Sequence, residues 1–525
     1  MGILNIFKSS NKVIYDEKNV NYNDDLVDRK NRIVGSLMGG AIGDALGYQI
    51  EFKRNVKDKE VTKYKNDKGI ISDDTQMTLF TANGLIWRET RGAMRGIALL
   101  PPDAVYESYL DWLDTQNNTN NHDTKNSWIK DIKELNIPRA PGNTCISALS
   151  SGKKGTIDNP INDSKGCGGI MRVAPLGLYM RNPEYAGKYA AEISAITHGH
   201  PLANIPSYVF ATMIYFILNE KLNIEESLNK AMIQYKEKYN IYDKKNNDYF
   251  VSLVDKAVRL SKDNTADLDA IAELGEGWVA EEAFAIAIYS CLKYQNSFED
   301  AIVCSVNHDG DSDSTGAIAG NIMGVYLGYD SIPKYYIDNL ELKDVIYEIA
   351  EDLSSDIPVG EYNENNDEYW LSKYLYCNRK KYLYRNLFLE RFDSKKIWSK
   401  SMSIQEIKDL LQFLENEISN CIFEIDENFI MNSRRKVLKD NIMDRLNKSE
   451  IVLEDVLESL FNFWEFIQDE YSGDLIIISK ELNKSVQELV VMDEKYRSKG
   501  IICEQEKQVI MEIINILKKA IVNHI

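Results

Sequence analysis

The sequence has few residues of the kinds that form disulfides or bind soft metals. Its 525 residues include seven cysteines and five histidines. The cysteines are scattered, odd in number and without a CxxC pair: Cys145, Cys167, Cys291, Cys304, Cys377, Cys421 and Cys503. This pattern excludes a disulfide framework and a zinc site built on paired cysteines, and it favours a reducing compartment.

Segments that could enter or cross a membrane are also lacking. Residues 1–22 have no long apolar core and no A-x-A cleavage site, so we predict no signal peptide. The most apolar long run, residues 205–218, is too short to span a bilayer and precedes a charged segment. A buried core helix is therefore favoured. We expect a cytoplasmic protein that has no membrane partner.

Positive charge is in deficit. The chain has 62 Lys and Arg against 81 Asp and Glu, which gives a formal net charge of −19. This balance argues against general binding to nucleic acids or to anionic membranes. Its simplest consequence is solubility.

Long alternating strand patterns are missing from the first 350 or so residues, and helical periodicity is found instead. Apolar residues recur at helical spacing from residue 31, interrupted by Gly39, Gly40, Gly43 and Gly47, which let another backbone or a ligand come close. Further helices are expected over 74–90, 101–116, 143–151, 183–197, 201–221, 223–239, 246–263, 279–295, 297–306, 314–328 and 342–355. The prediction is an all-α globule with a cleft built from loops.

Composition divides the chain into four parts. Residues 1–30 are polar and are expected to form a loose arm, and residues 31–355 hold the Gly, Asp and Ser clusters of a catalytic domain. Residues 356–370 are acidic and rich in Asn, as in a linker. We predict that residues 371–525 form a helical accessory domain of unknown role. Its basic and aromatic start, 371–400, is read as a helix with two faces in preference to a nucleic-acid patch, because of the net charge.

Two short acidic clusters, SDDTQ at 72–76 and DGDSDSTG at 309–316, carry most of the chemistry. Neighbouring carboxylates repel, so in a buried site they need a cation or raised pKa values. All the donors are oxygens, which suits Mg²⁺, Mn²⁺ or Ca²⁺ better than zinc. Helix capping explains either cluster alone and is compatible with a metal site. The two loops together predict a hard-metal site.

Seven segments follow one another in a recognisable order. They are GSLMGGAIGDALGYQIEF (35–52), SDDTQMT (72–78), RAPGNTCISAL (139–149), SKGCGGIMRVAP (164–175), THGHP (197–201), GEGWVAEEA (275–283) and NHDGDSDSTGAIAG (307–320). Together they resemble the ADP-ribosylglycohydrolase family over about residues 30–350. Each segment alone is a weak signal, but the ordered set is specific.

The resemblance implies an all-α fold with two Mg²⁺ or Mn²⁺ ions in a cleft. It places the metal ligands at Ser72, Asp73, Asp74, Asp311, Asp313 and Ser314, where Ser72 stands in place of the family's threonine. The implied catalytic residues are Glu51, Asp74 and Asp311. Glu51 would contact the substrate ribose and take part in proton transfer, with a surface or capping role as the alternative. Asp44 is expected to be structural, bonding nearby backbone N–H groups.

The same resemblance implies contacts to ADP-ribose. The loop before residue 170 has bare N–H groups that suit a diphosphate, with a tight packing turn as the alternative. His198 would contact ADP-ribose. His200 is expected to be a structural residue, and Trp278 is expected to be a core residue. The implied substrate-binding residues are Gly166, Cys167, Gly168, Gly169, His198, Gly275 and Gly277.

These features predict a hydrolase that cleaves the N- or O-glycosidic bond between ADP-ribose and a modified protein or small molecule, with arginine the favoured attachment. The alternative is an immunity or antitoxin protein that binds a cognate ADP-ribosyltransferase through residues 1–30 and 371–525, with or without hydrolysis. A metal-dependent phosphohydrolase of free nucleotides has no support beyond the acidic clusters.

Overall fold

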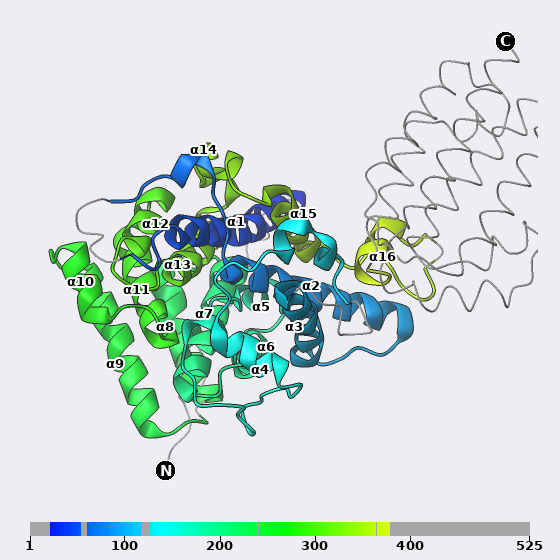
Figure 1. Cartoon of the computed structure of the whole chain (residues 1–525), viewed down its shortest axis with the longest axis horizontal. Coiled ribbons are helices and arrows are strands. Elements are labelled where there is room, and N and C mark those ends of the chain that lie inside the picture. The colour runs from blue at the N-terminus through cyan, green and yellow to red at the C-terminus, as the bar shows by residue number, and fades with distance from the viewer. Residues whose placement is uncertain (1–21, 54–59, 118–125, 240, 364, 378–525) are drawn as a thin grey trace, which may run out of the picture. The chain divides into compact units, whose positions relative to one another are not determined.

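The computed structural model describes residues 22–53, 60–117, 126–239, 241–363 and 365–377 (Figure 1). Helices make up its regular structure. Within these ranges the β-pairing consists of two isolated bridges, Gly69 with Leu340 and Gly166 with Val279. The predicted all-α class is therefore confirmed.

Each helix predicted between residues 74 and 355 is present, with ends that differ by a few residues. The helices are α1 Tyr22–Tyr48, α2 Asp73–Arg95, α3 Pro101–Asn117, α4 Asn143–Ser150, α5 Ala174–Tyr179, α6 Pro183–Ala195, α7 Pro201–Glu220, α8 Ile224–Lys238, α9 Lys244–Ser261, α10 Asp267–Leu274, α11 Ala280–Lys293, α12 Phe298–Val306, α13 Ser312–Leu327, α14 Lys334–Asp338, α15 Lys343–Ser354 and α16 Glu368–Tyr374. Helix α1 begins at Tyr22, inside the segment expected to be a loose arm. Its first turns are polar, so apolar periodicity could not reveal them.

Helix α7 forms the centre of the core. It packs against α5, α6, α8, α9, α11 and α13, and its residues from Leu202 to Leu218 are buried apart from Tyr215. It is long and apolar enough to cross a membrane, but 89% of its most apolar window is buried inside the protein. The prediction of a buried core helix is confirmed for this run.

Helices α1 and α13 pack backbone to backbone. Glycines at four-residue intervals face each other in antiparallel register, pairing Gly35 with Gly324, Gly39 with Gly320 and Gly43 with Gly316, and Gly47 lies against Ser312. A Cβ added to Gly43 would lie 2.0 Å from the carbonyl oxygen of Gly316. Each helical glycine costs about 0.5–1 kcal/mol relative to alanine. The close approach of the two backbones explains why glycine is kept.

This pairing brings together chain segments that carry the acidic residues. Helix α1 ends at Tyr48, three residues before Glu51, and α13 begins at Ser312, one residue after Asp311. Because the helices are antiparallel, the C-terminal end of α1 lies beside the N-terminal end of α13. Helix α2 begins at Asp73 and also contacts both of them.

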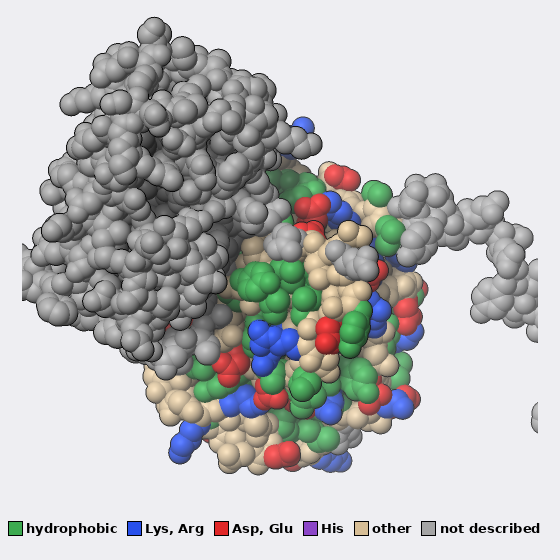
Figure 2. Space-filling model, turned by 90° about the vertical axis from the view of Figure 1, so that its right-hand side faces the viewer, with side chains coloured by type: hydrophobic (Ala, Val, Ile, Leu, Met, Phe, Trp, Pro, Cys, Tyr) green, Lys and Arg blue, Asp and Glu red, His purple; other side chains and the backbone are tan. Residues whose placement is uncertain are grey.

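Two compact units divide the chain: Met1–Thr119 with Ile129–Glu361, and Asn120–Trp128 with Tyr362–Ile525. Most of the second unit lies outside the described residues, as does the basic and aromatic segment from residue 378 onward. The accessory domain over 371–525 therefore stays a prediction. On the face of the described part seen in Figure 2, Lys and Arg side chains alternate with Asp and Glu.

We predict that Gly320→Ala destabilises the protein, because the added Cβ would lie 2.0 Å from the carbonyl oxygen of Gly39 and the two backbones must separate. The expected loss in the free energy of unfolding is about 2 kcal/mol or more. Chemical denaturation measures it. Gly92→Ala in α2 is the matched control, since its Cβ meets only Ala98 in an exposed turn. Equal stability of the two variants would contradict the close packing.

Candidate active site

The first acidic loop is held in place by α1. Ser72 caps α2, and its Oγ accepts a hydrogen bond from the N–H of Asp74 at 3.2 Å. The carboxylate of Asp44 in α1 accepts hydrogen bonds from the N–H groups of Ser72 at 3.0 Å and Thr75 at 3.1 Å, and from the Thr75 hydroxyl. The expected structural role of Asp44 is confirmed. Burial and the nearby Asp313 raise the pKa of Asp44 to about 7.

The second acidic loop caps α13. Asp311 is the N-cap residue, and its Oδ1 accepts a hydrogen bond from the N–H of Ser314 at 3.3 Å. Asp313 Oδ1 accepts from the same N–H at 3.1 Å. The N–H of Asp311 donates to the carbonyl oxygen of Glu276 at 2.8 Å, which ties this loop to the Gly275–Gly277 loop. Both acidic clusters therefore open helices, as their sequences predict.

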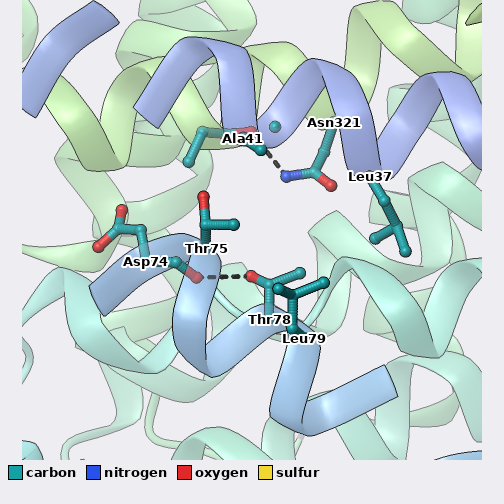
Figure 3. A pocket seen from close by; sticks show the side chains of 9 residues that line it. Leu37, Ala41, Asp74, Thr75, Thr78, Leu79 and Asn321 are labelled. Atoms are coloured by element: carbon teal, nitrogen blue, oxygen red, sulfur yellow. Dashed lines mark hydrogen bonds between the residues drawn. The ribbon is translucent and has the colours of Figure 1, made fainter. Parts of the chain in front are cut away.

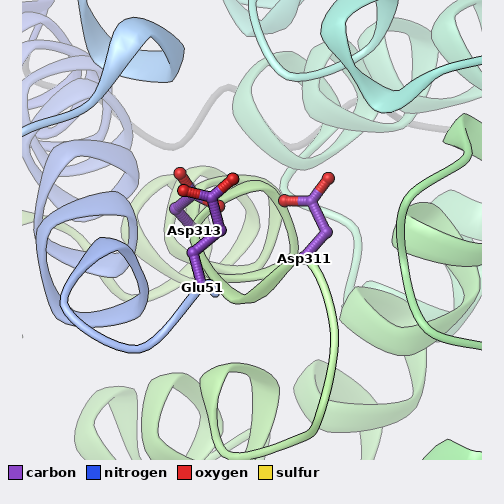
Figure 4. A group of neighbouring side chains, drawn as sticks. All are labelled: Glu51, Asp311 and Asp313. Carbon is purple, nitrogen blue, oxygen red and sulfur yellow. The ribbon is translucent and has the colours of Figure 1, made fainter. Parts of the chain in front are cut away.

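Three carboxylates from distant parts of the sequence converge. Glu51, in the turn after α1, and Asp311 and Asp313 each offer an oxygen atom, and these atoms lie within 4.8 Å of one another (Figure 4). Asp311 and Asp313 are 3% exposed and Glu51 is 9% exposed. Asp73 and Asp74, from the start of α2, are also buried; Asp73 acts electrostatically on Glu51 and on Asp74, and Asp311 and Asp313 act on Asp74. The two distant acidic loops thus form one cluster.

Crowding makes these carboxylates hard to ionise. Burial, followed by repulsion from Asp313 and Asp311, raises the pKa of Glu51 to about 10. Burial also raises the pKa values of Asp73, Asp74 and Asp311 well above the ordinary range, with Asp313 contributing to each shift. Cations that hold these groups together would offset both effects.

Two buried oxygen atoms support a cation in this cluster. Glu51 Oε2 and Asp74 Oδ2 have no hydrogen-bond partner among the described residues. Asp73 differs, because its Oδ2 accepts a hydrogen bond from the N–H of Gly142 at 3.1 Å. Unpaired buried carboxylate oxygens are costly unless protonated or bound to a cation. An all-oxygen donor set with free atoms fits a hard divalent ion.

A small cavity lies behind Asp74, between α1, α2 and α13 (Figure 3). It has room for about one water molecule. The Thr78 hydroxyl beside it donates to the carbonyl oxygen of Asp74 at 2.8 Å, and Asn321 donates to the carbonyl oxygen of Ala317 at 2.7 Å. The wall behind the acidic cluster is therefore polar but nearly filled.

The glycine loop before α5 is fixed by a neighbouring segment. Cys167 to Gly169 form a 3₁₀ turn, and the N–H of Cys167 donates to the carbonyl oxygen of Trp278 at 3.2 Å. The Cys167 thiol donates to Asp311 Oδ2 at 2.6 Å, and burial raises its pKa well above the usual thiol range. The glycine loop thus contacts the acidic cluster through a sulfur atom, a contact that the sequence does not reveal.

His198 lies under the glycine loop, and its side chain is buried. A Cβ added to Gly166 or Gly168 would lie 3.3 Å from its Nε2. Burial, together with the guanidinium of Arg172, lowers the pKa of His198 to about 3, so the ring is neutral. Arg172 is itself buried, donates to the Thr197 hydroxyl at 2.6 Å and lies 4.5 Å from the centre of the Tyr109 ring. His200 instead caps α7, accepting from the N–H of Leu202 at 3.0 Å.

The Gly275–Gly277 loop needs glycine at both positions. Their φ angles are 133° and 82°, in the region that side chains disfavour. Glu282 Oε2 accepts the N–H groups of Glu276 at 3.0 Å and Gly277 at 3.3 Å and so closes the loop. The expectation that Trp278 is a core residue was wrong. It is 40% exposed and stacks on Phe52, with ring centroids 6.2 Å apart.

The sequence was compared with known protein families. The model of the ADP-ribosylglycohydrolase family matches residues 25–362, which hold every candidate site residue. A relative from Rhodospirillum rubrum, ADP-ribosyl-[dinitrogen reductase] glycohydrolase, is 22% identical over 59% of this chain and 91% of its own length. ADP-ribosylarginine hydrolase Tri1 of Serratia proteamaculans is 26% identical over 61% of this chain and 78% of its own.

Two further likenesses are more limited. ADP-ribosylhydrolase ARH3 of Bos taurus is 25% identical over 34% of this chain and 54% of its own length. A solved structure described as an ADP-ribosylglycohydrolase-related protein complex matches 62% of this chain and 98% of its own, with a TM-score of 0.46 and 22% identity.

We predict that in the presence of a chelator the protein loses stability as the pH rises from about 5 to about 7.5. The folded state keeps protons on Glu51 and Asp44 that the unfolded chain releases near pH 4, so it binds more protons and its free energy of unfolding falls with pH. Glu51→Gln removes one such group and should flatten the slope. The exposed Glu60→Gln is the control and should keep it. Thermal melting measures both, and equal slopes in all three proteins would contradict the raised pKa of Glu51.

Proposed function

The chain belongs to the ADP-ribosylglycohydrolase family, and from that membership we propose that it is a Mg²⁺- or Mn²⁺-dependent hydrolase that releases ADP-ribose from modified arginine side chains. The hydrolase activity in general is supported by the family model and by relatives named as ADP-ribosyl hydrolases. We propose the metal dependence from the acidic cluster and the arginine linkage from the Serratia relative.

One observation carries the proposal: the oxygen atoms of Glu51, Asp311 and Asp313 lie within 4.8 Å of one another. They come from two segments that are distant in sequence and that match the family in order. A cluster of this kind would be destabilising as a purely structural feature, because its members raise one another's pKa values. We propose that the protein keeps this destabilising cluster because the cluster binds metal ions and substrate.

The residues present fit such ions. Asp311 and Asp313 at the start of α13, and Asp73 and Asp74 at the start of α2, would hold them, with the hydroxyl groups of Ser72 near Asp313 and of Ser314 near Cys167. When bound, the ions would neutralise the carboxylates and polarise the ribose hydroxyls. A second ion is suggested by the number of carboxylates, since one divalent ion would leave most of their charge unbalanced.

The proposed reaction is a hydrolysis. A water oxygen forms a bond to the anomeric carbon of the ribose, and the bond from that carbon to the guanidino nitrogen breaks. The nitrogen keeps the bonding electrons and gains a proton, so the products are ADP-ribose and unmodified arginine. Positive charge develops on the ribose on the way, and the surrounding carboxylates would stabilise it. Glu51 would transfer a proton at Oε2, and the lack of a hydrogen-bond partner for this atom among the described residues supports the assignment.

The diphosphate would lie along the Gly166–Gly169 loop. Its position is fixed by the bridge between Gly166 and Val279, and the ring of His198 lies beside Gly166 and Gly168. A neutral His198 beside the loop adds no charge, and the N–H groups of Cys167 and Gly169 already donate to the carbonyl oxygens of Trp278 and Gly166. We therefore propose that the N–H of Gly168 and the ions supply the attraction. Arginine linkage is supported by the name of the Serratia relative, an ADP-ribosylarginine hydrolase.

We predict that the protein releases ADP-ribose from an arginine-linked substrate in the presence of Mg²⁺ or Mn²⁺ and loses this activity with EDTA. Asp313→Asn should weaken metal binding, measured by calorimetry, and lower the rate by more than roughly 100-fold. Loss of a group that merely supports a metal ligand already costs about 10–100-fold.

The matched control is Asp309→Asn, which changes an exposed aspartate of the same acidic loop. It should retain both metal binding and activity. Full activity of the wild type in EDTA would refute metal dependence, and hydrolysis confined to serine-linked substrates would refute the linkage.

A further inference from the structure

Two aromatic side chains are exposed at the edge of the acidic cluster. Phe52 is 71% exposed and Trp278 is 40% exposed, and their rings stack with an angle of 25° between the planes. They come from segments more than two hundred residues apart, so the pairing depends on the fold. Apolar side chains placed together on a surface commonly mark a binding site.

Both aromatic residues directly follow a residue that belongs to the acidic cluster or lies beside it. Phe52 follows Glu51, one of the three converging carboxylates. Trp278 follows Gly277, where an added Cβ would lie 3.5 Å from the Cβ of Asp311. The carbonyl group of Trp278 also accepts the N–H of Cys167 at 3.2 Å, so its backbone is held on both sides. The backbone that carries the aromatic pair therefore lies next to the acidic cluster, and we call the pair the aromatic rim.

The chemistry of this rim favours a flat cation. Aromatic faces attract cations, and guanidinium groups in particular stack on them because they are planar and weakly hydrated. Phe52 adjoins the carboxylate residue Glu51 in the sequence, and Glu51 has an oxygen atom without a partner among the described residues. A serine side chain offers neither a positive charge nor a flat surface.

We propose that Phe52 and Trp278 form the subsite for the target side chain, and that its occupant is the guanidinium of an ADP-ribosylated arginine. This inference rests on the proposed function and deepens it, because it assigns the choice of linkage to two named side chains. The rings contact the leaving group, whereas the glycine loop and the acidic cluster contact ADP-ribose. They are positioning residues for the target.

The test compares binding of ADP-ribosylated agmatine, which carries the guanidinium, with binding of ADP-ribose, which lacks it. Calorimetry with Mg²⁺ measures both on the full-length protein, in a Glu51→Gln background that slows turnover. Phe52→Ala and Trp278→Ala should weaken binding of ADP-ribosylated agmatine by roughly 3- to 30-fold, the size of a cation–aromatic contact. Affinity for ADP-ribose should stay unchanged. Trp278→Phe keeps an aromatic face and should restore most of the lost affinity.

The control is Tyr185→Ala on α6. Tyr185 is 50% exposed and stacks on Tyr189 with ring centroids 5.6 Å apart. The substitution therefore removes a comparable aromatic pair elsewhere on the protein. It should alter neither affinity. Unchanged binding of ADP-ribosylated agmatine in Phe52→Ala and Trp278→Ala would overturn the inference. An equal loss for ADP-ribose would also overturn it, because the rings would then hold the nucleotide.

Turnover separates this inference from the proposed function. With Glu51 restored, KM for ADP-ribosylated agmatine should rise in Phe52→Ala, and KM for an ADP-ribosylserine peptide should not. A wild type that hydrolyses neither substrate would refute the proposed hydrolysis, yet the binding comparison would still decide the role of the rings. Hydrolysis with an equal KM change for both substrates would leave the hydrolase in place and overturn the guanidinium subsite.

Discussion

The contact between the backbones of α1 and α13 is the constraint on which the rest of the site depends. The interdigitated glycines set both the distance between the helices and their relative register. With that register, the turn after α1 delivers Glu51 to the start of α13, where Asp311 and Asp313 lie. The carboxylate of Asp44, also on α1, then binds the first turn of α2. One helix therefore positions acidic groups from three parts of the chain.

The acidic cluster stores unfavourable electrostatic energy, and the surrounding fold supplies the restraint. Carboxylates that raise one another's pKa values would separate if they were on mobile loops. Here two of the loops are helix N-termini with capping side chains, and the third lies directly after a helix packed through glycine. Rigid support of this kind keeps ligand atoms close before any ion binds, which is what a preorganised site requires.

Much of this arrangement could be predicted from the sequence, for physical reasons that also explain the gaps. Helical periodicity located α2, α7 and α13. The capping residues in the two acidic clusters also predicted where α2 and α13 begin. The glycines of α1 indicated a close backbone approach but not its partner, because a four-residue spacing carries no information about which helix it meets. The polar first turns of α1 lack periodicity. The exposure of Trp278 and the contact from Cys167 to Asp311 depend on how distant loops meet, which no local pattern encodes.

The glycine pairing also limits how the chain can change in length. Adding four residues within α1, between Gly35 and Gly47, would keep a glycine at every contact if the insertion supplied a glycine at the matching position, so the helices could still pack. It would nevertheless shift everything beyond that point by one helical turn, about 6 Å along the axis. That displacement exceeds the 4.8 Å within which Glu51 meets Asp311 and Asp313. An insertion of this kind is thus compatible with the helix packing but not with an assembled acidic cluster, and insertions should be confined to the loops.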